Sequence, residues 1–295
     1  MSGFEIKNGV LMKYVGEEPK VFIPEGVTAI GDEAFFGCET LEMVTVPRGV
    51  VSVGKSAFAE CKHLQSVVLG DTVTVIGDEA FYLCKNLQSV NIPDSVTTIG
   101  ERAFEICYSL QNVVFGKSVA SVGYGAFRGC KGLADEDGWI ILGNTVFDYF
   151  GKNKRIVIPK GVTAISGGAF RACESMRSIV LADIKNIGNG AFAHCNELKS
   201  ISLPEGIVGI GAGTFVGCER LKRVSIPDSV KSIGFGAFRG CRKLKSITVP
   251  ASVGLIDESA FAECDGLRSI QGVLGSFAEG YANRKGIRFI AVKLS

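Results

Sequence analysis

Metal-binding and catalytic signatures are scarce in this sequence of 295 residues. It has two histidines, His63 and His194, and no two cysteines stand in a Cys-x-x-Cys spacing. Zinc sites of the usual spacing are therefore excluded, and we predict no metal and no cofactor. Catalysis by histidine is not indicated either, because the two histidines lie in different halves of the chain and at different positions of the pattern described below.

Long apolar segments are also missing. No segment approaches the roughly 18 apolar residues of a membrane-spanning helix, so we expect no membrane insertion. The stretch Met1–Gly9 has no basic segment followed by the apolar run that a signal peptide needs, and the pattern Asn-x-Ser/Thr does not occur. We therefore expect either a cytoplasmic protein, or a fragment or processed form of an exported one.

The formal charge of +2 conceals a difference between the two halves. Residues 1–134 carry 11 Lys and Arg against 15 Asp and Glu, a net of −4, whereas residues 135–295 carry 21 against 15, a net of +6. The first half is mildly acidic and the second is basic. Hydrophobic residues make up 46% of the chain, which is ample for a continuous core and argues against disorder.

What the chain has instead is one unit repeated ten times. Each copy holds an Ala-Phe or Thr-Phe pair with a cysteine three residues after the phenylalanine. The steps between cysteines are 23 residues four times, then 43, then 22, then 23 three times, at Cys38, Cys61, Cys84, Cys107, Cys130, Cys173, Cys195, Cys218, Cys241 and Cys264. Such a period predicts a solenoid in which each coil buries its apolar side against its neighbours.

The unit resembles the BspA-like, or Treponema-type, leucine-rich repeats. Their pattern reads roughly Leu-x-x-Ile-x-Leu-Pro-x-x-Val-x-x-Ile-Gly-x-x-Ala-Phe-x-x-Cys, and Leu198 to Cys218 follows it with Thr214 in the place of Ala. The resemblance extends over about residues 20–275. It implies a curved solenoid used for binding, often in proteins at microbial surfaces, and it does not imply a reaction.

The segment Leu41-x-x-Val44-x-Val46 alternates in the way of a short strand. Leu41, Val44 and Val46 should point inward, Met43 and Thr45 outward, and the proline that follows should end the strand. We predict a leucine-rich-repeat solenoid of about 11 to 12 coils of 23 residues. A parallel β-sheet should form one face, with short helical turns and turns on the other.

Three segments depart from the repeat. Residues 4–24 read as a cap hairpin that turns at Asn8-Gly9, and residues 139–173 align with residues 4–38 without a gap. Residues 276–292 read as a helix followed by a strand, a C-terminal cap. We therefore expect residues 1–134 to hold the first cap and five repeats. Residues 135–295 should hold a second cap-like insert, five repeats and the C-terminal cap, in one continuous solenoid.

Two further expectations concern the coils themselves. The cysteines all occupy one repeat position, which favours buried free thiols stacked beside the phenylalanines. A coil spacing of about 4.8 Å would not by itself prevent a disulfide between neighbours. The coil between Cys173 and Cys195 is one residue short, at 181–184, and should be locally irregular.

The candidate binding site lies on outward strand positions. At one such position the first half has Glu42, Gln65, Gln88 and Gln111, whereas the second half has a column of five cations, Arg177, Lys199, Lys222, Lys245 and Arg268. Small polar residues run beside the column: Ser178, Ser200, Ser225, Ser246 and Thr248. These ten residues are the predicted ligand-binding face.

Two interpretations of the column remain open. The cations either keep the solenoid soluble, covering apolar surface with their stems, or attract an acidic protein or an anionic glycan. Nucleic acid is an unlikely partner, because no aromatic residues interleave the column. An enzyme would need a group of ionisable residues that breaks the repeat, and the sequence shows none.

We therefore predict a non-enzymatic binding module that mediates protein–protein or protein–glycan interaction. The resemblance implies adhesion or host interaction at a microbial surface, in a cell-surface or secreted protein. The alternative is an intracellular scaffold, which the missing signal peptide and unpaired cysteines favour. We expect a monomer.

Overall fold

Each coil contains two kinds of short strand. The computed structural model describes residues 3–292, and contacts divide the chain into two compact units, Met1–Ile140 and Ile141–Ser295. A three-residue strand lies just before the proline position, and a two-residue strand follows it. We call the stacks of these strands the wide ladder and the narrow ladder. The fold is a parallel-sheet solenoid of about 12 coils of about 23 residues, as predicted.

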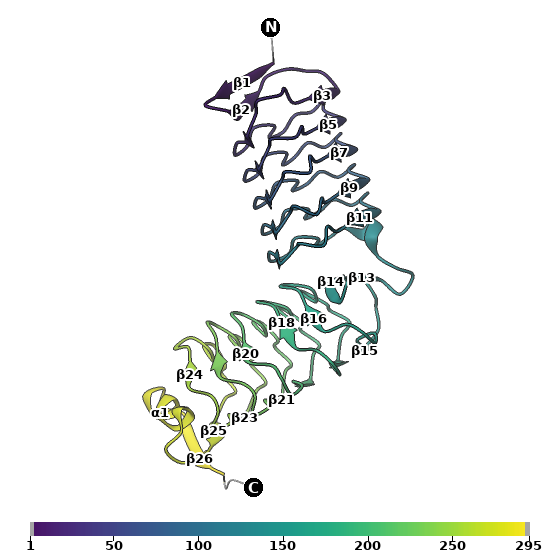
Figure 1. Ribbon diagram of the computed structural model, residues 1–295. Helices are drawn as coiled ribbons and strands as arrows, with labels where there is room; N and C mark the ends of the chain where they lie inside the picture. The colour runs from purple at the N-terminus through teal and green to yellow at the C-terminus, as the bar shows by residue number, and fades with distance from the viewer. Residues whose placement is uncertain (1–2, 293–295) are drawn as a thin grey trace. The chain divides into compact units, whose positions relative to one another are not determined.

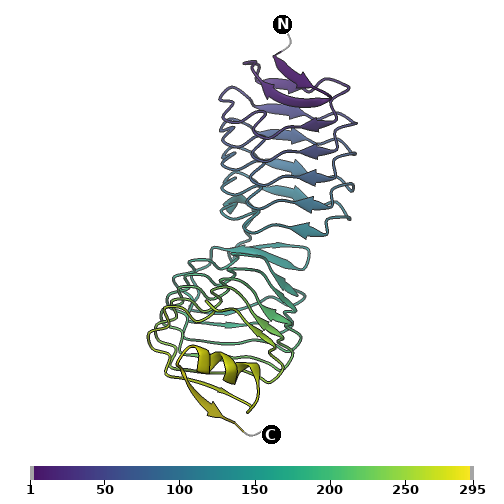
Figure 2. The same ribbon diagram turned by 90° about the vertical axis from the view of Figure 1, so that its left-hand side faces the viewer.

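In the first unit both ladders are continuous (Figures 1 and 2). The wide ladder is parallel and consists of β3 (Lys20–Phe22), β5 (Met43–Thr45), β7 (Ser66–Val68), β9 (Ser89–Asn91) and β11 (Asn112–Val114). The narrow ladder consists of β1 (Phe4–Lys7), β2 (Val10–Tyr14), β4 (Ala29–Ile30), β6 (Ser52–Val53), β8 (Val75–Ile76), β10 (Thr98–Ile99) and β12 (Ser121–Val122). A 3-10 helix, η1 (Lys131–Leu133), follows the last coil.

In the second unit both ladders are interrupted. The narrow ladder consists of β13 (Trp139–Leu142), β14 (Thr145–Tyr149), β16 (Ala164–Ile165) and β18 (Asn186–Ile187), then separately β20 (Gly209–Ile210), β22 (Ser232–Ile233) and β24 (Leu255–Ile256). The wide ladder falls into three groups, β15 (Arg155–Val157) with β17 (Ser178–Val180), β19 (Ser200–Ser202) with β21 (Arg223–Ser225), and β23 (Ser246–Thr248) with β25 (Ser269–Gly272) and β26 (Arg288–Ala291).

The short coil between Cys173 and Cys195 contains β17 and β18, and both interruptions lie between this coil and the next one. The missing residue predicted an irregularity in this coil. A further interruption, between β21 and β23, has no counterpart in the spacing of the sequence. The narrow ladder itself was not predicted, because two residues are too few to show an alternating pattern.

The core is a stack of aromatic rings. Phe35 lies 4.7 Å from Phe58 between ring centroids, and the following pairs in both units are 5.1 to 5.5 Å apart and nearly parallel. The predicted strand orientation is confirmed, because Leu41, Val44 and Val46 are buried and Met43 and Thr45 are not. This stacking is what a leucine-rich coil needs, since one coil alone cannot bury its apolar side.

The cysteines form a second stack beside the rings. All ten are free thiols; seven are buried, and Cys38, Cys173 and Cys264 are half-buried. The thiol of Cys61 donates to the carbonyl oxygen of Phe35 in the preceding coil at 3.0 Å, and most later thiols bond in the same way. Burial raises the pKa of the Cys84 thiol well above its ordinary value, so it stays protonated and able to donate.

The segment predicted to be the first cap forms a hairpin. β1 and β2 form an antiparallel hairpin through Asn8 and Gly9, both with positive φ, as a two-residue turn requires. Tyr14 of this hairpin stacks on the ring of Phe35 at 5.0 Å, and Tyr149 of the second hairpin lies 5.8 Å from Phe170 in the equivalent place. The duplicated segment thus performs the same packing in both units.

The C-terminal cap consists of α1 (Phe277–Arg284) and β26. Ser276 is the N-cap residue, and Gly286, with φ of +65°, follows the helix end. Tyr281 covers the last phenylalanine of the stack, Phe261, with a centroid separation of 5.9 Å. The division at 134/135 and the continuity of the two halves stay predictions.

The side of the coil opposite the wide ladder is made of turns. In the first coil the amide of Phe36 donates to the carbonyl of Glu33 at 3.0 Å, and that of Cys38 donates to Phe35 at 3.1 Å. A residue with positive φ, such as Glu33, lies between successive turns and prevents a continuous helix. The turns follow one another without forming an α-helix within the repeats described.

Candidate binding face on the second unit

The backbone places the predicted cations one above another. The amide of Lys199 donates to the carbonyl oxygen of Arg177 at 3.1 Å, and that of Lys222 donates to Lys199 at 2.9 Å. The amide of Arg268 donates in the same way to Lys245, also at 2.9 Å. Each of these residues immediately precedes a wide-ladder strand, so the column follows from the register of the coils.

A sixth cation extends the column. The amide of Arg177 donates to the carbonyl of Lys154 at 2.7 Å, which puts Lys154 at the same position of the preceding coil. Lys154 was missed because the cap-like insert hides the repeat there; the pairing of Arg155 with Ser178 reveals the equivalence. We call Lys154, Arg177, Lys199, Lys222, Lys245 and Arg268 the basic column.

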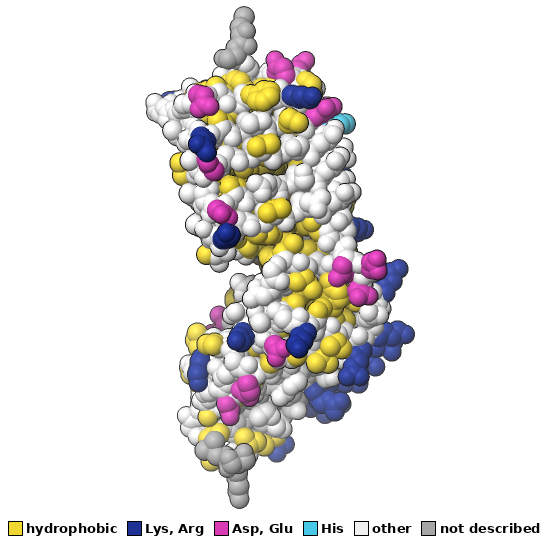
Figure 3. All heavy atoms as spheres, turned by 45° about the vertical axis from the view of Figure 1, so that its right-hand side comes forward, with side chains coloured by type: hydrophobic (Ala, Val, Ile, Leu, Met, Phe, Trp, Pro, Cys, Tyr) yellow, Lys and Arg dark blue, Asp and Glu magenta, His cyan; other side chains and the backbone are white. Residues whose placement is uncertain are grey.

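All six side chains of the basic column are exposed. Arg177 has one distant carboxylate, Glu197, at 3.9 Å, and Glu197 is bound more closely by Arg220 at 2.7 Å. Within residues 3–292 the other five make no ion pair. Figure 3 shows Lys and Arg side chains gathered on one flank of the second unit.

The polar residues beside the column occupy two rows and not one. Ser178, Ser200 and Ser246 stand at the first position of their strands, whereas Ser225 and Thr248 stand at the third. Both positions face outward, because the middle residue of each strand points into the core. The sequence analysis listed all five residues as one row, because the first and third positions of a strand both face outward and the repeat pattern alone gives them the same character.

Arg223 occupies the position in β21 that serine holds in the neighbouring strands, as its pairing with Ser200 shows. It therefore lies in the row of small residues, and its side chain is exposed. Its guanidinium makes no ion pair within the part of the chain that the structure describes. Together with Lys222 it gives this coil two adjacent cations.

A groove of about 630 Å³ runs over this face. It extends across β17, β19, β21 and β23, the strands between which the wide ladder is interrupted twice, and it is lined by Ser178, Ile179, Ser200, Ile201, Ser202, Arg223, Val224, Ser225, Ile226, Ser246, Ile247 and Thr248. All five predicted polar residues line it. Four cations of the basic column, Arg177, Lys199, Lys222 and Lys245, immediately precede the strands that line the groove, whereas Lys154 and Arg268 belong to the coils on either side.

The groove presents hydroxyl groups that the protein leaves unused. Thr248 donates to the side chain of Gln271 at 3.0 Å. In the described part of the chain, the hydroxyls of Ser178, Ser200, Ser202, Ser225 and Ser246 make no side-chain hydrogen bond. Five hydroxyls and one guanidinium are thus free to bind a ligand.

The same positions of the first unit carry no such charge. The amide of Gln65 donates to Glu42 at 2.8 Å and that of Gln88 donates to Gln65 at 3.0 Å, so these residues stack as the basic column does. The outward positions there include exposed apolar side chains, Val68, Val114 and Phe22. The basic character is a property of the second unit and not of the repeat.

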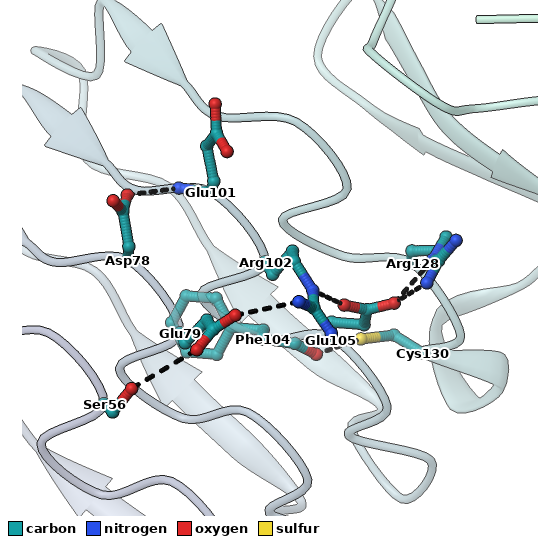
Figure 4. A network of polar contacts seen from close by, with 9 residues as sticks. All are labelled: Ser56, Asp78, Glu79, Glu101, Arg102, Phe104, Glu105, Arg128 and Cys130. Carbon is teal, nitrogen blue, oxygen red and sulfur yellow. Dashed lines mark hydrogen bonds and ion pairs between the residues drawn. The ribbon is translucent and has the colours of Figure 1, made fainter. Parts of the chain in front are cut away.

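A second group of ionisable residues does break the repeat pattern, contrary to the sequence-based expectation. Figure 4 shows it in the first unit. The Glu105 side chain is 0% exposed and accepts hydrogen bonds from Arg102 and from Nε of Arg128, the latter at 2.6 Å. Nη1 of Arg102 also donates to Glu79 at 2.8 Å, and Ser56 donates to Glu79 at 3.4 Å.

This cluster was missed because its members are three and 23 residues apart, and only the turn and the coil stacking bring them together. The carboxylate of Glu105 is bound by two guanidinium groups, so it is held as a counter-ion and has no free oxygen to act as a base. The hydrogen bond to Glu105 raises the pKa of Arg102 further, which keeps its guanidinium charged. The cluster joins successive coils.

His194 lies far from His63 in the chain and belongs to the other unit. It borders a hollow of about 330 Å³ with Arg239, Arg242 and other residues. Both arginines already have carboxylate partners. Arg239 lies 2.6 Å from a carboxylate oxygen of Glu263, and Arg242 lies 3.7 Å from one of Glu219.

Comparison with known families decides the assignment of the repeat. The model described as "BspA type Leucine rich repeat region" matches residues 8–134 and 140–268 in six copies. The chain belongs to the BspA-type leucine-rich repeat family. The resemblance seen in the sequence is thereby confirmed. Proteins of this family are in general leucine-rich-repeat binding scaffolds. No curated protein matches the chain.

Solved structures of bacterial proteins share the fold. A leucine-rich cell surface protein from Faecalibacterium prausnitzii A2-165 is 28% identical, with a TM-score of 0.53 over 92% of both chains. A leucine-rich repeat protein from Eubacterium ventriosum is 21% identical, with a TM-score of 0.60 over 88% of this chain and 77% of that one. The pneumococcal vaccine antigen PcpA is 19% identical, with a TM-score of 0.51 over 97% and 92%. Across residues 3–292, no helix is long and apolar enough to cross a membrane.

Proposed function

We propose that this BspA-type protein is a non-enzymatic binding module whose second unit recognises a protein or a glycan. The observation that carries the proposal is the basic column, which stands without close counter-ions beside a groove of unused hydroxyls. Repeat solenoids use extended surfaces of this kind for binding. Charges that the fold leaves unpaired are available to a partner.

The chemistry of the groove favours binding over catalysis. Arg223 is its one ionisable lining residue, and a guanidinium stays protonated and cannot accept a proton. A serine becomes a nucleophile when an adjacent base removes its proton, and none of the lining residues can do so. Binding without reaction is the role that this set of side chains supports.

Adhesion or host interaction at a microbial surface is the setting that we propose for this binding. The relative from Faecalibacterium prausnitzii is described as a cell surface protein and aligns over 92% of this chain. A solenoid that presents cations in a row would attract acidic surface components over a distance. The protein acts as a monomer in this proposal, because one chain carries the complete face.

An intracellular scaffold is the second candidate, and the thiols favour it. All ten cysteines are free, and free thiols are typical of a reducing compartment. Fractionation of the native cells distinguishes the two candidates. The protein should be recovered with surface or secreted fractions in the first case and with the cytosol in the second.

The test of binding compares three forms of the chain. The first is intact; the second, the column variant, carries Gln at Arg177, Lys199, Lys222, Lys245 and Arg268. The third, the control variant, carries Gln at exposed lysines of the first unit, Lys7, Lys55, Lys62, Lys85 and Lys117. Both variants lose five positive charges, so they share the same net charge and differ in its location.

Each form is applied to panels of extracellular proteins and glycans and to lysate. We expect partners to bind the intact chain and the control variant and to be lost from the column variant, while circular dichroism shows all three folded. Equal binding by the column variant would mean that the column is a solvated face. The proposal would also fail if no component bound the intact chain.

A further inference from the structure

We infer that the ligand of the second unit is a linear acidic polysaccharide, a chain of sugars that carry carboxylate or sulfate groups. It runs along the stacking direction, with its anionic groups on the basic column and its hydroxyls on the groove. The inference rests on the proposed binding function and specifies its ligand. It is carried by the spacing, the charge and the composition of the face.

The spacing of the cations calls for a ligand that repeats. One cation stands on each of six consecutive coils, and backbone hydrogen bonds of 2.7 to 3.1 Å fix four of the five steps between them. Strand spacing makes each step about 4.8 Å, so the basic column is roughly 24 Å long. A linear polymer with an anion on each sugar or each second sugar places charges along the whole length. A compact acidic ligand would reach two or three of the six.

The composition of the face argues against a protein ligand. Protein interfaces are enriched in aromatic residues, Met and Arg and depleted in Lys and Ser, and their binding energy concentrates at buried aromatic or Arg anchors. Four of the six residues of the basic column are lysine. The polar lining of the groove consists of serines, Thr248 and one arginine, and the groove has no aromatic side chain. A protein would find no pocket for an anchor here.

Nucleic acids and neutral glycans fit less well. Single-stranded nucleic acids bind largely by stacking of bases on aromatic side chains, which the groove lacks. A neutral glycan would bond to the hydroxyls and leave the basic column without counter-ions. An acidic polysaccharide satisfies both parts of the face, because it carries anions and hydroxyls on the same chain.

The individual contacts follow from the side-chain chemistry. A lysine ammonium is a mobile point charge with three donors and accepts either a carboxylate or a sulfate without a fixed geometry. Arg223, whose planar guanidinium is free and lies within the groove, is suited to bind one anionic group with two parallel hydrogen bonds. The hydroxyls of Ser200, Ser202 and Ser225 can donate to ring and hydroxyl oxygens or accept from sugar hydroxyls.

The test is a titration of the intact chain, the column variant and the control variant by calorimetry. Heparin and polygalacturonate supply sulfated and carboxylated chains, neutral dextran supplies the uncharged chain, and poly-glutamate supplies an acidic polypeptide. Heparin oligosaccharides of increasing length form a second series. Each titration is repeated at 50 and 300 mM salt with circular dichroism as the control for folding.

We expect heparin or polygalacturonate to bind the intact chain and the control variant, and dextran to bind neither. The column variant should bind at least about tenfold more weakly, since each exposed ion pair contributes modestly and five are removed. The variant Arg223→Gln should also bind more weakly. Its affinity should still fall as salt is raised, because the lysines of the basic column remain. Affinity should rise with oligosaccharide length and level off near a contour length of roughly 24 Å.

Two results would overturn the inference while leaving the binding function intact. One is tighter binding of poly-glutamate or of a captured protein than of either acidic polysaccharide; the other is binding of dextran as tight as that of the tighter-binding acidic polysaccharide. Affinity that is the same for the column and control variants would show that net charge alone attracts the polymer, and would contradict the proposed site. Failure of every panel and polymer to bind the intact chain would remove both proposals.

Discussion

The basic column should destabilise the protein when no ligand is bound, and its removal should raise the melting temperature. Like charges about 4.8 Å apart repel by about 0.9 kcal/mol in water, and screening at physiological salt lowers this to about 0.5 kcal/mol. The column variant loses all five contacts between neighbouring cations. It should therefore be more stable by at most about 2.5 kcal/mol.

Two features of the structure reduce this figure. The side chains are exposed and can splay apart, and Arg177 is attracted by Glu197 at 3.9 Å. We expect a gain of about 1 to 2 kcal/mol, which corresponds to a melting temperature higher by roughly 2 to 8 °C for a unit of this size. The control variant removes lysines that are spread over the first unit, so its melting temperature should change much less.

Scanning calorimetry at two salt concentrations is the appropriate assay. At about 1 M salt the screening length is about 3 Å, so the intact chain should gain stability relative to the column variant and the difference should largely disappear. A column variant that melts below the intact chain at low salt would refute this reasoning. So would a difference that does not depend on salt, because it would show that repulsion between the cations is not its cause.

Further predictions concern the first unit, and urea unfolding measures each of them. Phe81→Ala, within the ring stack, should lower the free energy of unfolding by about 3 to 5 kcal/mol. Phe22→Ala, at a side chain that is 69% exposed, should lower it by less than about 0.5 kcal/mol. Similar losses for the two variants would contradict the stacked core. Glu105→Ala should cost less than about 1 kcal/mol, because alanine stands at this repeat position in three other coils. The double change Arg102→Ala with Arg128→Ala should cost about 3 to 5 kcal/mol, because it strands the buried carboxylate; the reverse order of costs would show that the network is not held together by Glu105.

The repeat and its caps were predictable because their signals are local and recur. The Ala-Phe-x-x-Cys spacing fixes the coil length, and Asn8-Gly9 has the conformational freedom that a two-residue hairpin turn requires. Ser276 precedes the C-terminal helix and Gly286 follows its end, as the sequence signals predicted, although within the described residues the Ser276 hydroxyl makes no capping hydrogen bond. Each of these features is visible within one or two dozen residues, so tertiary contacts did not need to be known.

The remaining features depend on register and on contacts between coils. Two-residue strands such as Ala29–Ile30 show no alternation, so the narrow ladder became visible only through pairing. Lys154 joins the basic column and Arg223 enters the row of serines because of how coils align. The Glu105 cluster joins ionisable residues of three coils, and a sequence pattern read one coil at a time does not connect them.

The location of the ligand tests the central claim most directly. Intact protein is treated with a lysine-acetylating reagent, with and without a heparin oligosaccharide, and the modification of each lysine is read by mass spectrometry. We predict that the ligand protects Lys154, Lys199, Lys222 and Lys245 of the basic column, while the exposed lysines of the first unit, Lys7, Lys55 and Lys85, react as before. Protection confined to the first unit, or spread evenly over all lysines, would contradict the claim that the second unit carries the binding face.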